Sequence, residues 1–479
     1  MSAPSNETSL SAIESRHIDY VPESERHGKV WRQGPFWFLG NFQTFTLAIG
    51  LLGPVFGLNL LWTFIATVAG MLFGTLFMAA HAAQGPKLGL PQMIQSRAQF
   101  GYSGVLIPLI ATTFTFAGFL VVDTVLIKLG INGIFGWNKT LVAVVLSVAS
   151  GLLAIYGHDW VHRVFIVLFW LSVPCWLLLT IGVVSGKVHG TPMTDPLGYN
   201  FTGFIAMFAT VASYNITYAP YVSDYTRYLP KETPARAVIN SVFWGAAGSP
   251  TWLIPLGAWL AIQFGATDAL VGLHDAGNQY ISNLGTVLSI LSVLALVATM
   301  GMGAYSGMLS IVTAIDSFKP VSTGSRLRIV VIILLTVVTL GLALVLDNAI
   351  TALYAALTIM LYLLAPWTAI NLIDFYSVRH GKYAITDLFT PKGIYGNWGK
   401  NGLIAYAVGI AFELPFIYVI GYYESPGATK LNGVDISWML GLLVGGLVYW
   451  ALTRSLDVTS EASAIEASEA TLRATGSAR

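Results

Sequence analysis

Long apolar stretches separated by short polar connectors dominate the chain. Each is roughly twenty residues or longer, the length at which an α-helix crosses the hydrocarbon core of a bilayer. We predict twelve such helices, at 35–58, 60–83, 103–129, 139–157, 162–185, 201–222, 239–264, 284–315, 327–346, 349–375, 402–422 and 436–453. They form one transmembrane domain over 34–454, with polar segments at 1–33 and 455–479 on either side.

Lysine and arginine provide a separate test of this pattern. With the first residue inside the cell, 20 of the 24 basic side chains fall in interior segments. The exterior holds only Lys128, Lys139, Lys187 and Lys430. Such an excess is what the positive-inside rule predicts, so we expect a multi-pass protein of the cell membrane with both ends in the cytoplasm.

The amino-acid composition excludes most other classes of protein. The chain is 55% hydrophobic and 10% charged, whereas soluble domains are about 25% charged. A net charge of +1 provides no basic field for nucleic acid. We therefore expect membrane lipid around the helices, no nucleic-acid partner, and no metal site, because the eight histidines show no ligand spacing. The oligomeric state, monomer or otherwise, stays open.

The two ends differ in character. Residues 18–22 (IDYVP) indicate an extended piece that lies on the protein, whereas 455–479 is rich in Ser, Ala and Glu and is typical of a solvated tail.

Inside the domain, Gly50–Pro54 and Tyr218–Pro220 interrupt the first and sixth spans, and a shift of 166 residues (220 − 54) superposes the two prolines. Matching interruptions in two halves point to inverted repeats with broken helices.

Three polar segments carry a family resemblance. They are 85–102 (GPKLGLPQMIQSRAQFGY), 223–230 (SDYTRYLP) and 21–26 (VPESER). Together they resemble the nucleobase-cation-symport family of purine–cytosine permeases, from about Glu14 to the last span. Read from the residues alone, these segments are also connectors that fasten the bundle, and we expect Arg97 to bind lipid phosphate or backbone carbonyls there.

The resemblance implies an all-α membrane fold of two inverted five-helix repeats plus two further helices, with helices 1 and 6 broken. It further implies alternating access to a site between helices 1, 3, 6 and 8, where a planar heterocycle stacks on aromatic rings. No cofactor is expected. The coupling ion is sodium in some relatives, while others are taken to use protons.

Helix 3 provides the first candidates. Phe119 and Asp123 align with an aromatic residue and an amide of the relatives, and their i, i+4 spacing places both on one face. An ionisable group within a span is costly and is functional by default, although Asp123 could instead bind a neighbouring helix or Lys128. If it titrates during transport, Asp123 would be the coupling group.

Helix 6 contains Ser213–Pro220 (SYNITYAP), a polar and aromatic run that membrane depth tolerates only at a cavity or an interruption. Asn215, Thr217 and Tyr218 are candidate substrate contacts, and Tyr214 is equally compatible with packing.

Helices 1 and 8 complete the candidate set. Gln43 and Phe45 lie near the expected break of helix 1. Helix 8 offers Thr299, although fungal relatives have two adjacent asparagines where Thr299 and Met300 align, so the chain departs from them there. Gly40, Gln43, Thr299 and Ser306 are candidate oxygen ligands for a cation, although hydroxyls in membrane helices often bond to their own backbone.

These observations favour a secondary transporter that imports a nucleobase such as cytosine or a purine. The alternatives are an allantoin, hydantoin or vitamin carrier of the same family and, from other classes, a membrane enzyme or a channel. Glu413, the other carboxyl at depth, lies outside the expected repeats, so we expect it at a helix interface.

Overall fold

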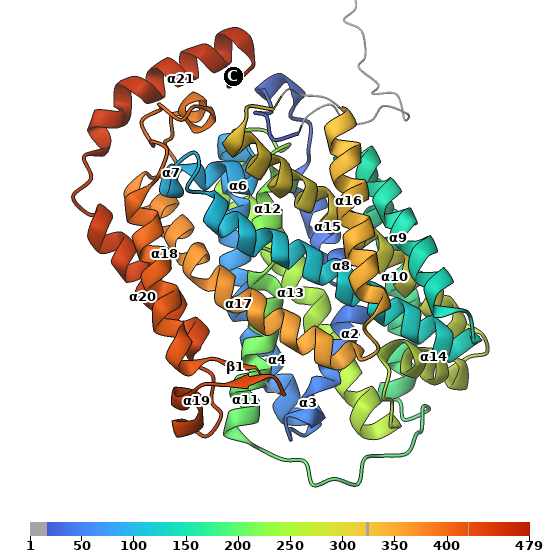
Figure 1. Cartoon of the computed structure of the whole chain (residues 1–479). Helices are drawn as coiled ribbons and strands as arrows, with labels where there is room; N and C mark the ends of the chain where they lie inside the picture. The colour runs from blue at the N-terminus through green and yellow to red at the C-terminus, as the bar shows by residue number, and fades with distance from the viewer. Residues whose placement is uncertain (1–16, 322–324, 420) are drawn as a thin grey trace, which may run out of the picture.

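The computed structural model describes residues 17–321, 325–419 and 421–479 and is built almost entirely of helices (Figure 1). One short antiparallel hairpin is present in this part of the chain, β1 (Tyr418–Val419) with β2 (Tyr423–Glu424). The Arg479 and Asp19 side chains lie 3.4 Å apart, so the two described ends of the chain meet at one end of the bundle. We call this end the terminal face.

Helices occupy all twelve predicted segments. Span 1 is α1 (Gln33–Gly40), α2 (Thr44–Gly50) and α3 (Leu52–Val55), and span 6 is α11 (Phe201–Ile216) and α12 (Ala219–Thr226). The other spans are α4 (Leu60–Ala82), α8 (Leu106–Phe135), α9 (Lys139–Tyr156), α10 (His158–Val184), α13 (Ala235–Trp259), α15 (Leu284–Phe318), α16 (Ser325–Leu344), α17 (Ala349–Ile373), α18 (Lys400–Glu413) and α20 (Ser437–Thr453). The shorter helices are η1 (Glu23–Glu25), η2 (Val30–Arg32), α5 (Gln84–Leu88), α6 (Gln92–Gln95), α7 (Arg97–Phe100), η3 (Leu260–Phe264), α14 (Ala269–Tyr280), η4 (Asp374–Val378), η5 (Ile385–Phe389), η6 (Leu414–Phe416), α19 (Pro426–Lys430), η7 (Val458–Glu461) and α21 (Ala462–Thr475).

The number of crossings is not settled by helix length alone. Within the described residues, seven helices are long and apolar enough to cross a bilayer singly, or up to ten if each bent pair is one span. The predicted twelve are therefore present as helical segments but are not each confirmed as a crossing. Two of the segments that fall short, α18 and span 6, are short or interrupted.

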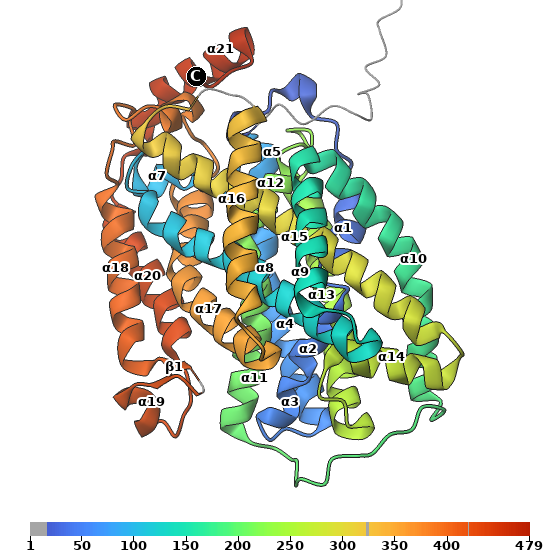
Figure 2. The same cartoon turned by 45° about the vertical axis from the view of Figure 1, so that its right-hand side comes forward.

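The contacts between helices define two packed groups, most of whose members are labelled in Figures 1 and 2. In the first group, α8, α9, α15 and α16 each pack on the other three. In the second, α13 packs on α1, α2 and α4, while α4 packs on α11 and α12. Beyond them, α18 and α20 pack on each other and on α17, as expected for helices added beside a repeated core.

The break of span 1 is not where the repeat argument placed it. The chain bends by 58° between Gly40 and Thr44, whereas Pro54 lies inside α3, near the end of the span. The prediction that aligned Pro54 with Pro220 was therefore wrong in register, whereas a broken span 1 with its break near Gln43 and Phe45 is confirmed. Proline in the first turn of a helix is tolerated because its missing N–H has no partner there anyway, so Pro54 lies in the first turn of a short helix that begins at Leu52 and does not mark the main break.

The segment before α1 lies on the protein, as predicted. Ile18 and Val21 are buried, and the Val21 N–H donates to the Gly89 carbonyl at 2.9 Å. Arg97 is fully buried in the connector between spans 2 and 3, where it binds the Leu388 carbonyl and Asp316. Of the two partners predicted for Arg97, the structure shows backbone carbonyls.

The region 455–479 differs from the solvated tail that its composition predicts. It contains η7 and α21, and Ser468 on α21 is buried and accepts a hydrogen bond from the Thr386 N–H. Composition misses this because the attachment combines polar contacts with only a few apolar side chains, Ala464, Ile465 and Leu472, that pack on the core.

Glycine sets the closest approach within the second group. A Cβ on Gly257 of α13 would lie 1.9 Å from the Leu47 carbonyl oxygen of α2, whereas a Cβ on Gly341 of α16 would meet nothing within 4 Å. We expect Gly257→Ala to lower the free energy of unfolding by about 1–3 kcal/mol, the usual cost of overpacking. Gly341→Ala, a matched control, should be neutral or stabilising by up to ~1 kcal/mol. Thermal unfolding of both purified variants in one detergent checks this, and equal melting temperatures would contradict it.

Candidate functional site

The break in span 1 is built around Gln43. This residue is extended (φ −157°, ψ 179°), and its side-chain oxygen accepts hydrogen bonds from the Phe45 and Thr46 N–H groups at the start of α2. Its amide nitrogen donates to the Gly40 carbonyl at 3.4 Å and to the Tyr214 hydroxyl at 3.2 Å. Within a membrane, backbone groups freed by a break need such partners, so Gln43 caps one half of the span while facing span 6.

Span 6 is interrupted at Thr217 and Tyr218, between α11 and α12. Pro220 in the first turn of α12 has no N–H to lose, and the Thr217 hydroxyl donates to the Tyr214 carbonyl at 2.9 Å. The Tyr218 hydroxyl reaches the Gly40 carbonyl at 3.5 Å. The two breaks therefore lie side by side.

An amide of span 1 joins these breaks. Asn41 donates to the Asn215 side-chain oxygen at 3.0 Å and to the Ala246 carbonyl at 2.9 Å. Asn215 in turn donates to the Thr75 hydroxyl at 2.6 Å. Both amides are fully buried, so the Asn215 nitrogen is already occupied by protein partners. Its role as a substrate contact stays a prediction.

Five aromatic rings line the same region. They are Phe45, Phe119, Tyr214, Tyr218 and Tyr221, and all are buried. Phe119 stacks on Tyr218 with centroids 5.5 Å apart and planes 12° apart, and Phe45 stacks on Tyr214 at 5.2 Å and 19°. Phe45 and Phe119 lie 5.4 Å apart, which brings the pairs together. At these separations the rings contact each other, so a planar substrate would have to displace one of them.

Asp123 is one helical turn beyond Phe119 on α8. Its side chain is 2% exposed, and its Oδ1 has no hydrogen-bond partner among the described residues. The predicted alternative partner, Lys128, lies instead 3.5 Å from Asp347. A buried polar atom left without a partner is rare in native structures, so Asp123 offers hydrogen-bonding capacity that the protein itself does not use.

Three predicted residues meet at the Gly40 carbonyl. Gln43, Tyr218 and Thr299 each donate to it, with Thr299 at 3.4 Å, although the Thr299 hydroxyl also lies 3.0 Å from its own Ala295 carbonyl. Ser306 lies on the same continuous helix, seven residues and therefore about 10 Å further along. Oxygen ligands of a hard cation lie ~2.3–2.6 Å from it, so Thr299 and Ser306 cannot hold one ion together. The predicted set of four is not a single site.

Sequence reasoning missed several members of this region. Asn41 was not singled out, and Tyr214 and Tyr221 were not assigned to the site. The spacing of Tyr214, Tyr218 and Tyr221 is i, i+4, i+7, which marks one helix face and could have identified them together. No comparable signal exists for Asn41, because its partner is 174 residues away.

The remaining carboxyl at depth lies elsewhere. Glu413 of α18 is buried against Gly441 of α20, the helix interface that its position predicts. Among the described residues, no group of three or more His, Cys, Asp or Glu is placed to hold a metal ion.

The site lies between the two packed groups. Phe119, Asp123 and Thr299 come from α8 and α15 of the first group, whereas Gln43 and Tyr218 come from the broken spans of the second. A ligand bound here would contact both groups at once.

Comparison with known proteins agrees with this arrangement. A family model described as a permease for cytosine/purines, uracil, thiamine and allantoin matches residues 20–441. A putative purine-cytosine permease of Bacillus subtilis (strain 168) is 34% identical over 446 residues, covering 92% of this chain and 96% of the relative. The allantoin permease of the same strain is 24% identical over 478 residues, covering 91% and 92%.

Solved structures share the fold. Mhp1, a nucleobase-cation-symport-1 family transporter in a closed conformation with bromovinylhydantoin bound, matches with a TM-score of 0.71 at 17% identity, covering 92% of this chain and 96% of that one. A Na⁺-coupled sialic acid symporter matches with a TM-score of 0.62 at 12% identity, covering 92% and 93%. The predicted all-α transporter fold with broken helices is confirmed, and the chain is a multi-pass membrane transporter rather than an enzyme. It belongs to the family of permeases for cytosine/purines, uracil, thiamine and allantoin, as its three polar connecting segments indicated.

Proposed function

We propose that this protein is a symporter that imports a nucleobase, cytosine or a purine, by alternating access coupled to sodium or protons. The observation that carries the proposal is the buried Oδ1 of Asp123, which has no hydrogen-bond partner among the described residues and lies one turn from the stacked rings of Phe119 and Tyr218. A nucleobase has a flat π-face for the rings and ring N–H groups for a carboxylate, which can accept two hydrogen bonds or donate one when protonated. The relative of 34% identity carries the name of a purine-cytosine permease.

The terminal face is cytoplasmic in this proposal, and the surrounding bilayer is the cell membrane. The excess of basic residues in the segments assigned to that side supports the orientation. The two described ends, which meet at this face, are consistent with an even number of crossings.

Transport assays test the proposal directly. Proteoliposomes loaded with an unlabelled base should accumulate the labelled base by counterflow, which a channel does not support. We expect cytosine or a purine to exchange, and a binder at a hundredfold excess over its Kd to stabilise the purified protein by about 2.7 kcal/mol. Allantoin, hydantoins and pyridine vitamins complete the panel, because relatives named for allantoin and vitamin B6 exist. Exchange confined to one of these compounds would contradict the nucleobase assignment.

Stacking makes a second prediction. Phe119→Ala removes one of the two rings that would enclose the base, and an aromatic pair contributes about 0.5–1.5 kcal/mol beyond burial. Affinity measured by equilibrium binding should fall by roughly twofold to tenfold, while Phe119→Trp should retain it. Wild-type affinity in Phe119→Ala would place the base away from α8.

Asp123 separates proton from sodium coupling. Asp123→Asn keeps hydrogen bonding but cannot titrate, so under proton coupling this variant should bind and exchange substrate yet fail to accumulate it against a gradient. Under sodium coupling, sodium-driven accumulation should persist in the same variant. Accumulation of substrate by proteoliposomes under an imposed pH or sodium gradient gives the readout. Full transport by Asp123→Ala would remove Asp123 from the site.

A further inference from the structure

Helix α21 lies along the edge of the terminal face (Figures 1 and 2), and the chain is attached to the bundle at both of its ends, so we call it the strap. At its start, Glu461 accepts two hydrogen bonds from the Arg379 guanidinium, at 3.1 and 2.9 Å. Arg379 is itself buried and also binds Asp374. A two-point arginine–carboxylate contact of this kind fixes geometry as well as charge, so this end of the strap is firmly attached.

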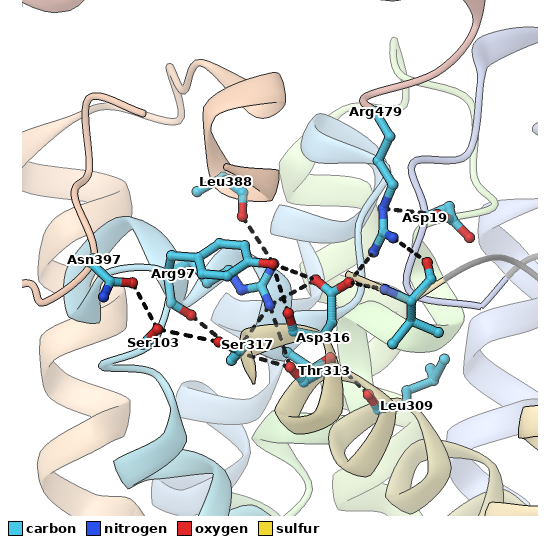
Figure 3. Close-up of polar contacts among 12 residues, drawn as sticks. Asp19, Arg97, Ser103, Leu309, Thr313, Asp316, Ser317, Leu388, Asn397 and Arg479 are labelled. Carbon is cyan, nitrogen blue, oxygen red and sulfur yellow. Dashed lines mark hydrogen bonds and ion pairs between the residues drawn. The ribbon is translucent and has the colours of Figure 1, made fainter. Parts of the chain in front are cut away.

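The other end of the strap is held through Arg479 (Figure 3). Its guanidinium lies 2.9 Å from Asp316 Oδ1 and 3.4 Å from Asp19 Oδ1, and it donates to the Val321 carbonyl. The guanidinium carbon lies 5.1 Å from the centre of the Phe389 ring. Two carboxylates, a carbonyl and an aromatic face are the partners that suit a planar, delocalised cation.

We propose that Asp19, Asp316, Phe389 and the Val321 carbonyl form a guanidinium-binding site, and that its occupation by Arg479 holds the terminal face closed. Asp316 lies in the last turn of α15, in the first packed group. Asp19 lies on the segment that leads into α1, in the second group. Arg479 therefore bridges the two groups at the surface, and the Thr299–Gly40 contact bridges the same two groups at the candidate site.

The charges around Asp316 make this contact releasable. Asp316 is 2% exposed, and its Oδ2 also lies 3.0 Å from Arg97, whose side chain is 0% exposed. Breaking a buried ion pair is costly when it leaves one charge uncompensated. When Arg479 leaves, Asp316 keeps Arg97, and the Arg479 side chain, 26% exposed in place, returns to water. Arg97 is thus the permanent partner and Arg479 the exchangeable one.

The role of this contact in transport rests on the proposed function. The closure of the terminal face by Arg479 can itself be tested without any substrate. Two exposed residues, Ser24 in η1 and Lys319 just past α15, take spin labels as cysteines in a Cys175→Ser background. The distance between the two labels is measured by pulsed electron–electron double resonance. We expect Arg479→Gln to raise the fraction of Ser24–Lys319 distances longer than the wild-type mean at least twofold. Arg473→Gln removes the same charge from a side chain that is 77% exposed and pairs with Glu469 along α21, and it should leave the distances unchanged. Identical distributions for the two variants would overturn the proposal.

Chemical rescue tests the nature of the site. Guanidinium chloride at tens of millimolar, far below denaturing concentrations, should restore the short distances in Arg479→Gln by filling the vacated position, whereas equal sodium chloride should not. A widened distribution that guanidinium does not reverse would overturn the guanidinium-binding site. Because neither readout involves the transported solute, a failure here is distinguishable from a failure of the nucleobase assignment, which the exchange assay decides.

Discussion

Two interrupted stretches of backbone lie side by side in the middle of this bundle, and the Asn41 amide joins them. A bilayer supplies no water to satisfy a broken helix, so each interruption needs side-chain partners within the protein. Gln43 provides them within span 1, the Thr217 hydroxyl provides one within span 6, and the Asn41–Asn215 side-chain bond links the two spans. The other features of the site depend on these two adjacent breaks, because the breaks bring the Gly40 carbonyl, the Tyr218 ring and the start of α2 to one place.

The helical segments could be predicted because their cause is local. An apolar run of bilayer length is helical wherever it occurs, and all twelve predicted segments contain helices. The break in span 1 was indicated in two ways that disagree. Proline, a strong local signal, drew attention to Pro54, whereas the expected break near Gln43 and Phe45 is the one that the structure contains. There the break depends on Gln43 and on Tyr214, which lies 171 residues away. A helix is interrupted where partners that are distant in sequence can satisfy the freed backbone groups.

At the candidate site, too, some residues carry a local signal in the sequence and others do not. Phe119 and Asp123 were indicated by their alignment with the relatives, and their spacing placed both on one helix face, whereas their neighbours Tyr214 and Tyr221 carried a periodic signal that went unused. Ser306 shows what residue type alone leaves open, because its hydroxyl lies on the same helix as Thr299 but seven residues further along, too far for both to hold one ion. The strap was missed for a related reason. Its attachment depends on Arg379 and Asp316, which are distant in sequence, and few large apolar residues in 455–479 announce a packed helix.

The candidate site and the Arg479 contact both lie between the same two groups of helices, the first in the middle of the bundle and the second at the terminal face. Asp123 and Phe119 belong to the group of helices that contains α15, and the broken spans belong to the other group. A ligand shifts an equilibrium between two arrangements only by the difference in its affinity for them. Under the two proposals, a base that stacked on Phe119 and also contacted the broken spans would gain both contacts only with the groups close together, so it would favour the arrangement in which Arg479 can reach Asp316 and Asp19 together. Substrate binding at the centre and closure at the terminal face would then be coupled through the same two groups of helices, without a separate pathway of residues between them.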